Sequence, residues 1–194
     1  MRLFVAIVPP PPVTAELDAC AAPLRLAWPD LRWTSQEAWH VTLAFLGQVR
    51  EDVLPELSTR LERAARRHRA QRLAVRGGGA FPGPSRARVV WAGLDADRAA
   101  LAALAASVAA GARRAGAPSP DEDRRFRAHI TLARLREPAD LRSLTEGLAD
   151  LAGTPWTATE IQLIRSHPPG PGAGRTPVYT SLAAWPLDQA LNRQ

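Results

Sequence analysis

The sequence predicts an α+β fold built as a two-lobed, pseudo-symmetric duplication, in which each lobe is an antiparallel sheet backed by helices and a central groove holds the active site. Three observations support this prediction. The heptapeptide HVTLAFL at residues 40–46 returns as HITLARL at residues 129–135, with five identical letters and one Val-to-Ile change. Strand-like runs alternate with helical stripes around both copies, and two copies are too few for a solenoid. The length of 194 residues suits a single domain over residues 1–194, with two packed lobes and one copy of the motif in each.

The N-terminal region predicts a strand followed by a helix. The run LFVAIV at residues 3–8 is typical of a buried strand and is far too short to cross a membrane. Pro11 and Pro12 suit the first turn of a helix that ends before Pro29. The apolar stripe of this helix contains Val13, Leu17, Ala21 and Leu24. Cys20 shares that stripe, which indicates core packing, and as the only cysteine it allows no intramolecular disulfide.

The middle region predicts a strand, a helix, two strands and a second helix. Residues 39–46 are rich in β-branched and aromatic types, and the acidic pair at residues 51–52 then favours a helix N-terminus. Strands are expected around residues 73–76 and 88–94, with the turn-rich GGGAFPGPS between them. Asp95 is the expected cap of the next helix. The apolar faces of the two helices are Leu54, Leu57, Leu61 and Ala65, and then Leu101, Leu104 and Val108.

The last region repeats the order of strand and helix. Residues 128–135 form the second motif strand, and Pro138 is placed to open a helix. That helix would present Leu141, Leu144, Leu148 and Leu151 to the core. Two final strands are expected at residues 156–166 and 178–185, joined by a loop rich in Pro and Gly.

The charge of the chain favours a polyanionic partner such as RNA. The net charge is +6, the sequence pI is near 11.1, and all 25 basic residues are arginines. Such a balance indicates non-specific attraction and does not define a site. No membrane partner is expected, and without a signal peptide or a lipidation motif the cytoplasm is the expected location.

The repeated motif places the same polar pair on one face of each strand. Because side chains alternate along a strand, His40 and Thr42 share a face, about 7 Å apart, and His129 and Thr131 do the same. If the lobes pack about a pseudo-twofold axis, both pairs line one groove. A lone histidine on a strand is usually a hydrogen-bonded, half-buried side chain, whereas two near-identical copies favour a functional site.

Two facing histidines suit a displacement reaction at phosphorus. In-line attack needs a base on the entering oxygen and an acid on the leaving oxygen, on opposite sides of the phosphorus. Two imidazoles with ordinary pKa values of about 6.5 can provide one neutral and one protonated ring near neutral pH. The threonine hydroxyls can donate hydrogen bonds to the non-bridging oxygens, where negative charge develops.

The stretches HVTLAFLG and FRAHITLAR resemble the paired H-x-T-x signatures of the 2H phosphoesterase superfamily, specifically its bacterial RNA 2',3'-cyclic phosphodiesterases, also called 2'-5' RNA ligases. The resemblance covers nearly the whole chain, from MRLFVAI through RVVWAGL at residues 88–94 to Ser166 and Tyr179. Two features depart from the expected pattern. Ala128 stands where a proline is expected, and the loop after Ser166 is longer than expected.

The resemblance implies a bilobal hydrolase that opens a 2',3'-cyclic phosphate at an RNA 3' end, leaves a 2'-phosphate, and needs neither cofactor nor metal. It implies that His40 donates the proton to the departing 3'-oxygen, that His129 accepts a proton from water, and that Thr42 and Thr131 hold the phosphate. Arg134 extends the second motif and is a further candidate for binding the phosphate, if the strand bends its side chain away from the apolar face. The expected partners are RNA ends with a 2',3'-cyclic phosphate or small cyclic nucleotides, and the expected state is a monomer.

Other candidate features have simpler interpretations. His68 is expected to be a packed or edge side chain, and His167 a solvated loop residue. The arginines between residues 60 and 72 are expected to form a solvated helix face. The triplet GGG at residues 77–79 lacks the Lys-Ser/Thr ending of a phosphate loop. Two histidines without a third and fourth ligand at recognisable spacing do not define a zinc site.

Two alternative functions stay open at this point. A 2'-5' RNA ligase or phosphodiesterase would differ only in the nucleophile, because a ribose hydroxyl would replace water. A non-catalytic module could use the same groove to bind RNA or a nucleotide. Turnover of a cyclic nucleotide by the purified protein separates the enzymes from the binding module.

Overall fold

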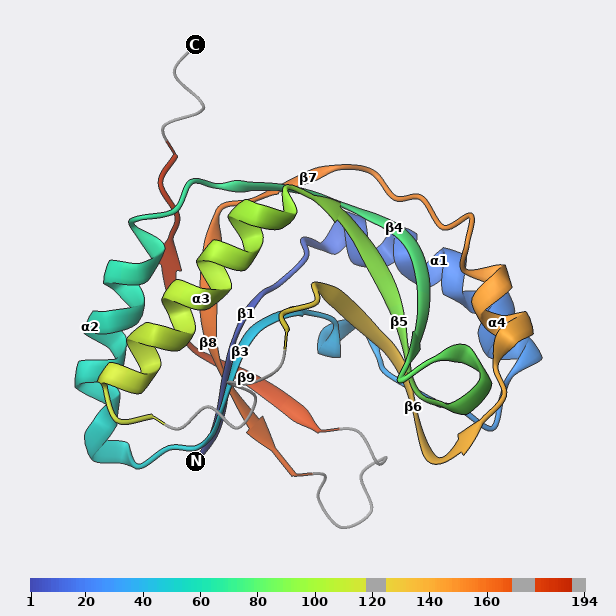
Figure 1. The fold of residues 1–194 in the computed structure, drawn as a ribbon, viewed down its shortest axis with the longest axis horizontal. Helices are drawn as coiled ribbons and strands as arrows, with labels where there is room; N and C mark the ends of the chain where they lie inside the picture. The colour runs from blue at the N-terminus through green and yellow to red at the C-terminus, as the bar shows by residue number, and fades with distance from the viewer. Residues whose placement is uncertain (118–124, 169–176, 190–194) are drawn as a thin grey trace.

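The computed structural model describes residues 1–117, 125–168 and 177–189, and their strands form one nine-stranded, curled antiparallel sheet (Figure 1). The strand order is β7-β4-β5-β6-β3-β1-β8-β9, and β2 pairs with β6. The strands are β1 (Arg2–Ile7), β2 (Arg32–Trp33), β3 (Val41–Gln48), β4 (Gln71–Phe81), β5 (Ala87–Ala96), β6 (His129–Ala139), β7 (Trp156–Ala158), β8 (Glu160–His167) and β9 (Val178–Pro186). The predicted α+β class is confirmed, and the two halves of the chain share one continuous sheet that joins at β3 and β6.

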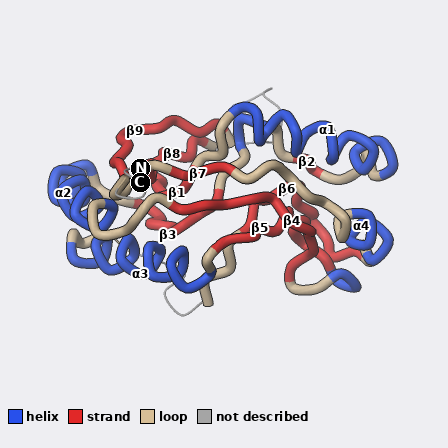
Figure 2. Tube along the Cα trace, turned by 90° about the horizontal axis from the view of Figure 1, so that it is seen from above, coloured by secondary structure: helices blue, strands red, loops and turns tan. Residues whose placement is uncertain are grey.

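Two pairs of helices lie at opposite ends of the molecule (Figures 1 and 2). The helices are α1 (Pro11–Ala27), α2 (Leu54–Ala65), α3 (Arg98–Arg114) and α4 (Arg142–Gly147), with short 3-10 turns η1 (Gln36–Ala38), η2 (Glu51–Val53) and η3 (Pro84–Arg86). α2 packs on α3, and α4 lies against α1, so closely that a Cβ added at Gly147 would be 3.1 Å from Leu24. No helix within the described ranges is both long and apolar enough to cross a membrane.

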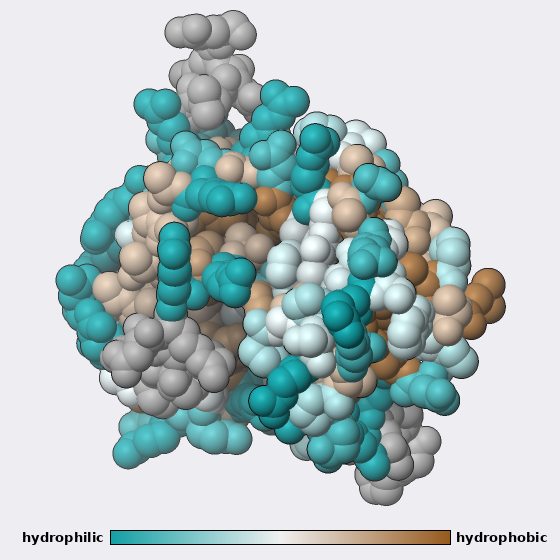
Figure 3. Space-filling view, turned by 45° about the vertical axis from the view of Figure 1, so that its right-hand side comes forward, coloured by the Kyte–Doolittle hydropathy of each residue, from teal (hydrophilic) through white to brown (hydrophobic). Residues whose placement is uncertain are grey.

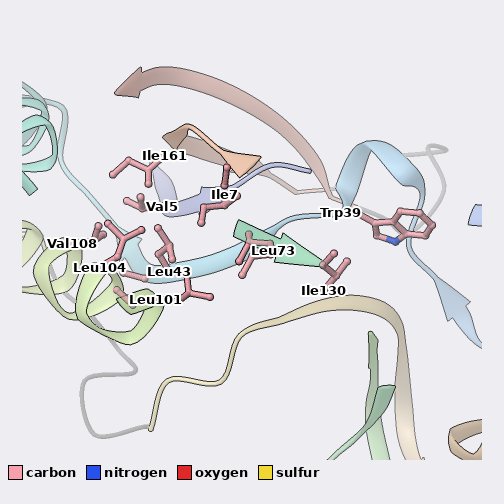
Figure 4. Close-up of a cluster of buried hydrophobic side chains, with 14 of the residues drawn as sticks. Val5, Ile7, Trp39, Leu43, Leu73, Leu101, Leu104, Val108, Ile130 and Ile161 are labelled. Carbon is pink, nitrogen blue, oxygen red and sulfur yellow. The ribbon is translucent and has the colours of Figure 1, made fainter. Parts of the chain in front are cut away.

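The main hydrophobic core lies on one face of the sheet, beneath the helices. It combines strand residues such as Leu43 and Ile130 with helix residues such as Leu101 and Leu104 (Figure 4). The other face carries a second, smaller cluster formed by Phe4, Ala6 and Ile164, with Tyr179 packed on it. On the side of the molecule drawn in Figure 3, hydrophilic residues are widespread, and apolar residues lie both in a recess and towards the right-hand edge. The alternation of side chains along the strands therefore separates a core face from a partly polar face.

The turn-rich stretch expected at residues 77–85 begins later than predicted, because β4 runs through all three glycines to Phe81 and the chain turns only after it. A Cβ at Gly79 would lie 2.6 Å from Cζ2 of Trp91, and a Cβ at Gly78 would lie 2.7 Å from the Trp91 carbonyl oxygen. These glycines therefore allow close contact with β5, and they do not form a turn.

The expected boundaries of two helices were also wrong. Asp97, not Asp95, caps α3, and its carboxylate accepts hydrogen bonds of 3.0 Å from the amides of Ala99 and Ala100. Asp95 still belongs to β5, where it pairs with a residue of β4. Pro138 lies in β6, because this strand continues to pair with β5 up to Ala139.

Cys20 is exposed, so the prediction that it fills the core was wrong. The buried residues of α1 are Val13, Leu17 and Ala21, each four positions after the previous one. The sheet therefore covers only a narrow stripe of this helix, and Cys20 lies beside that stripe.

Candidate active site

The strands that carry the two motifs pair with each other in the middle of the sheet. Val41 of β3 lies opposite Ile130 of β6 in an antiparallel pair. If this register is extended by one residue to either side, His40 lies opposite Thr131 and Thr42 lies opposite His129. Val41 and Ile130 are fully buried on the core side. The two His-Thr pairs therefore lie together on the other face, related by an approximate twofold axis.

Both histidine rings are oriented by the same kind of hydrogen bond. Nδ1 of His40 lies 2.8 Å from the carbonyl oxygen of Ala38, and Nδ1 of His129 lies 2.7 Å from that of Arg127. Because a carbonyl oxygen can only accept, Nδ1 carries the hydrogen in each ring. Nε2 is consequently the nitrogen that can accept a proton in the neutral ring or donate one in the charged ring.

His40 lies in an apolar, aromatic environment. Its ring centre is 4.6 Å from that of Phe4 and 5.3 Å from that of Tyr179, which meets it edge-on. Burial lowers the pKa of His40 to about 4 from the usual 6.5. The hydrogen bond to the backbone carbonyl acts in the opposite direction, whereas the charges of Arg134 and His129 lower the pKa further.

His129 has a corresponding aromatic environment made by other strands. Its ring centre is 5.0 Å from that of Phe81 and 6.5 Å from that of Trp91. Burial lowers the pKa of His129, and the charges of Arg134 and Arg127 act in the same direction, against the effect of its carbonyl hydrogen bond. Both rings therefore favour the neutral form when no anion is present.

A β-bulge brings Arg134 to the same face as the histidines. Val90 of β5 pairs with Ala133, but the next residue, Trp91, pairs with Thr131, so β6 has one extra residue at this point. The extra residue reverses the alternation of side chains beyond it. Arg134 is exposed, and its charge affects the pKa of both histidines. This bulge is the bend in β6 that was expected to turn Arg134 away from the apolar face.

Thr34 hydrogen-bonds both to the second motif and to Trp39, the residue before His40. Thr34 was not identified from the sequence. Its hydroxyl lies 2.7 Å from the carbonyl oxygen of Thr131 and accepts a 2.9 Å hydrogen bond from Nε1 of Trp39, while its amide donates to the Leu132 carbonyl at 2.8 Å. Thr34 and the second motif are far apart in the sequence, so no local pattern could indicate this contact.

The other histidines lie apart from this cluster. Nε2 of His68 is 2.8 Å from the hydroxyl of Ser107, in a contact between the end of α2 and α3. His167, at the end of β8, is 3.2 Å from the hydroxyl of Thr180. Neither ring contacts a motif histidine in the described part of the chain, and His68 packs as predicted.

Arg60 of α2 and Arg66, the C-cap of this helix, pair with acids of α2. Arg60 contacts Glu56 at 2.6 Å and Arg66 contacts Glu62 at 2.6 Å, each one turn away. These pairs are typical of a solvated helix face, as predicted, but the end of the predicted run is not helical, because Arg69 forms a β-bridge and Arg72 lies in β4. Across residues 1–117, 125–168 and 177–189, no group of three His, Cys, Asp or Glu side chains has a geometry suitable for a metal ion.

Ser166 and Tyr179 are register partners in the β8-β9 hairpin. This pairing puts the Tyr179 ring against His40. Residues 169–176, which form most of the Pro/Gly-rich loop between these two strands, lie outside the described residues.

Comparison with known proteins relates both halves of the chain to one family. A family model described as "LigT like Phosphoesterase" matches residues 7–91 and again residues 93–173. Each match contains one of the two motifs. The duplication inferred from the repeated heptapeptide is therefore consistent with two matches to the same family.

Similar proteins are found in archaea and bacteria. An RNA 2',3'-cyclic phosphodiesterase of Aeropyrum pernix is 34% identical over 70% of this chain and 74% of its own length. An RNA 2',3'-cyclic phosphodiesterase of Thermus thermophilus is 32% identical over 96% of this chain and 90% of its own length. Among solved structures, the Thermus thermophilus protein TT0787 has a TM-score of 0.80 at 31% identity, covering 97% of this chain and 99% of that one. E. coli LigT complexed with NADP+ has a TM-score of 0.72 at 26% identity, over 97% and 98%.

Proposed function

This chain belongs to the family of LigT-like phosphoesterases, and on that basis we propose that it hydrolyses the 2',3'-cyclic phosphate at RNA 3' ends to a 2'-phosphate. The observation that carries the proposal is the direct pairing of the two motif strands through Val41 and Ile130. This pairing puts two histidines on one face, where each Nε2 can exchange a proton. The names of the relatives support the substrate, since several are RNA 2',3'-cyclic phosphodiesterases.

In the proposed reaction the two histidines transfer protons on opposite sides of the phosphorus. Nε2 of neutral His129 takes a proton from water while the water oxygen forms a bond to phosphorus. The bond from phosphorus to the 3'-oxygen breaks, and that oxygen takes the proton from Nε2 of charged His40. His129 ends charged and His40 neutral, so proton exchange with solvent restores the starting state.

Three side chains are placed to hold the phosphate during this step. Thr42 and Thr131 share the face of the histidines and can donate hydrogen bonds to the non-bridging oxygens. Arg134 adds a permanent positive charge on that face. Negative charge develops on these oxygens in the transition state, where such donors have the greatest effect.

The lowered pKa of His40 is compatible with its role as the acid. A pKa of about 4 describes the free site, in which no acidic side chain of the described residues forms an ion pair with either imidazole or with the Arg134 guanidinium. A phosphate between the rings supplies that partner and favours their charged forms. Binding of the anionic substrate would therefore raise the pKa of His40 and provide the proton that the leaving oxygen needs.

The test uses a nucleoside 2',3'-cyclic phosphate, with products identified by phosphorus NMR. We expect a 2'-monophosphate from the wild type. His40→Ala and His129→Ala should each lower turnover by about 10² to 10⁴. The double variant should be little worse than either single variant, because both rings act in one step. His68→Ala is the matched control, since this histidine contacts Ser107 in a different part of the fold.

The outcome separates the proposed hydrolase from the alternatives. Tight binding without turnover would indicate a nucleotide-binding module. A 2'-5' linked product in the presence of an RNA with a free 5'-hydroxyl would indicate ligation. Wild-type hydrolysis by a folded His40→Ala or His129→Ala protein would contradict the two-histidine mechanism.

A further inference from the structure

The strands of the two motifs are joined by a very short ladder. Val41 and Ile130 form the single register pair between β3 and β6 in the described part of the chain. Proton transfer on opposite sides of one phosphorus needs both histidines at fixed positions relative to each other. Other contacts between the two halves must therefore help to fix this relation.

Thr34 makes such a contact. It follows β2, which pairs with β6. Its amide donates a 2.8 Å hydrogen bond to the carbonyl of Leu132, and its hydroxyl lies 2.7 Å from the carbonyl oxygen of Thr131 and 2.9 Å from that of Leu132. These carbonyl groups belong to the bulge of β6. Thr34 is therefore bound to the backbone of the second motif by its main chain and by its side chain.

Trp39 connects Thr34 to the first motif. Its Nε1 donates a 2.9 Å hydrogen bond to the Thr34 hydroxyl. Trp39 is only 2% exposed, and a buried indole N–H that has no acceptor is costly. The Thr34 oxygen thus accepts from the first half of the chain while it donates to the second. A hydroxyl group can do both at once, and a methyl group can do neither.

The turn between Thr34 and Trp39 contains the hydrogen-bond acceptor of His40. Two backbone hydrogen bonds close this turn at η1, one from the amide of Ala38 and one from the amide of Trp39. The carbonyl oxygen of Ala38 is the group that lies 2.8 Å from Nδ1 of His40. The orientation of this carbonyl, and with it the tautomer of His40, depends on how the two ends of the turn are held.

The second motif has no equivalent of this arrangement. The residue before His129 is Ala128, where the first motif has Trp39. Its methyl group makes no hydrogen bond. The acceptor of the His129 ring is the carbonyl oxygen of Arg127, whereas the hydrogen bonds from Thr34 to β6 end further along the strand. The contacts of Thr34 therefore act on the orientation of one histidine and not on that of the other.

We propose that Thr34 is a positioning residue that acts through Trp39. It holds His40 in the tautomer with the hydrogen on Nδ1, and it fixes the place of His40 relative to the second motif. The catalytic consequence rests on the proposed function. A His40 ring that turns no longer presents Nε2 to the departing 3'-oxygen.

The first test is the tautomer of each histidine in Thr34→Val, which keeps the shape of the side chain but can neither donate nor accept. Long-range proton–nitrogen NMR of protein labelled in its histidines identifies the tautomer of each ring. At about pH 7, well above the pKa of about 4 of His40, the wild type should show the hydrogen on Nδ1 in both His40 and His129. In Thr34→Val, His40 should show both tautomers, while His129 should stay as in the wild type.

The second test is hydrolysis of a nucleoside 2',3'-cyclic phosphate. Thr34→Val should lower kcat by roughly 10- to 100-fold with a much smaller change in KM, because the acid acts mainly in the transition state. Thr34→Ser keeps the hydroxyl and should restore both kcat and the tautomer. Thr59→Val is the matched control, since it removes a hydroxyl that lies 3.1 Å from the carbonyl oxygen of Pro55 within α2, and it should change neither.

Trp39→Phe tests the same hydrogen bond from its donor side and decides the matter if Thr34→Val does not fold. It removes the indole N–H and leaves the bonds between Thr34 and β6 in place. The His40 ring should again show both tautomers. The double variant Thr34→Val/Trp39→Phe should have a kcat no lower than that of Thr34→Val, because both changes remove one interaction.

A wild-type His40 tautomer in folded Thr34→Val, an equal change in His40 and His129, or a failure of Thr34→Ser to restore the tautomer would each overturn the proposal. The NMR measurement needs no substrate, so it is independent of the proposed function. If His40 alone changes in a protein that hydrolyses no cyclic phosphate, the positioning role stands and the hydrolase proposal fails. If the wild type hydrolyses the substrate and Thr34→Val keeps both its kcat and its tautomer, the hydrolase stands and the positioning role is rejected.

Discussion

The hydrogen bond from each Nδ1 to a backbone carbonyl two residues earlier decides which nitrogen of the motif histidines can react. In both rings it fixes the tautomer, and it leaves Nε2 for proton exchange. Burial acts against the charged form of both rings, and it does so most strongly at His40, whose pKa falls to about 4. The free site is thus a cluster of neutral imidazoles beside Arg134, ready to take up protons together with an anion.

This property predicts that sulfate binds more tightly as the pH falls. Both free pKa values lie below 6.5, and bound sulfate raises them, so binding takes up protons between the free and bound values. The dissociation constant of sulfate should therefore decrease from about pH 7.5 to about pH 5. Isothermal titration calorimetry in buffers of different ionisation enthalpy measures both affinity and proton uptake. The His40→Gln/His129→Gln double variant should lose this dependence, and a wild-type dissociation constant independent of pH would contradict the prediction.

Within single elements, helix ends and β-bulges determine the direction in which the side chains of the candidate site point. The bulge in β6 turns Arg134 to the face of the histidines. The chain between β4 and β5 turns at η3, and the glycines of β4 allow Trp91 to pack closely. The start of α3 and the contact between β4 and β5 each lead to a stability prediction.

The N-cap of α3, Asp97, should contribute to the stability of the protein. Asp97→Ala should lower the free energy of unfolding by about 0.5 to 2 kcal/mol, because two helix amides lose their acceptor. Asp95→Ala is the matched control and should have little effect, since this exposed carboxylate lies in β5 and does not cap the helix. Urea denaturation of both variants checks the difference. An equal loss in the two variants would argue against the observed cap.

The close contact between β4 and β5 at Gly93 should also be needed for stability. A Cβ at Gly93 would lie 2.4 Å from the carbonyl oxygen of Arg76, and a backbone atom cannot move aside as a side chain can. Gly93→Ala should therefore lower the free energy of unfolding by about 1 to 3 kcal/mol, and it should reduce activity because Gly93 pairs with His129. Gly83→Ala is the control, since nothing lies within 4 Å of its Cβ position. Wild-type stability of Gly93→Ala in urea denaturation would refute this account of the close approach.

At the scale of the whole molecule, the site exists only where the two halves of the chain meet. His40 belongs to one half and His129 to the other, and a single residue pair joins their strands. The surrounding rings come from four further strands: β1, β4, β5 and β9. The complete fold is therefore needed to bring the two His-Thr pairs and their aromatic neighbours together.

The composition of the assembled site predicts that catalysis survives chelation. In the described ranges no cluster of three potential ligands exists, and the proposed chemistry relies on proton transfer between two imidazoles and the substrate. Hydrolysis of a cyclic nucleotide should be unchanged after prolonged dialysis against EDTA. Loss of activity that a single divalent ion restores would point to a metal-dependent mechanism.

Much of this protein can be predicted from sequence periodicity and from the repeated motif. The apolar stripes locate α1, α2 and α3, and alternation along the strands puts the histidine and threonine of each motif on one face. The repetition itself indicates a pseudo-symmetric fold with paired histidines. These features depend on residues within a few positions of each other, so they can be read from the chain alone.

The way in which the two motifs face each other, and the side chains that surround them, follow from contacts between segments that are distant in the sequence. The Val41–Ile130 register, the bulge that turns Arg134, and the hydrogen bonds of Thr34 depend on strands that are distant in sequence. The exposure of Cys20 depends on how much of α1 the sheet covers. The low pKa of His40 depends on burial beside rings from β1 and β9. Strand register, the part of a helix that the sheet covers and the burial of a side chain are set by pairing and packing between distant segments. The helix and strand propensities of neighbouring residues contain no information about them.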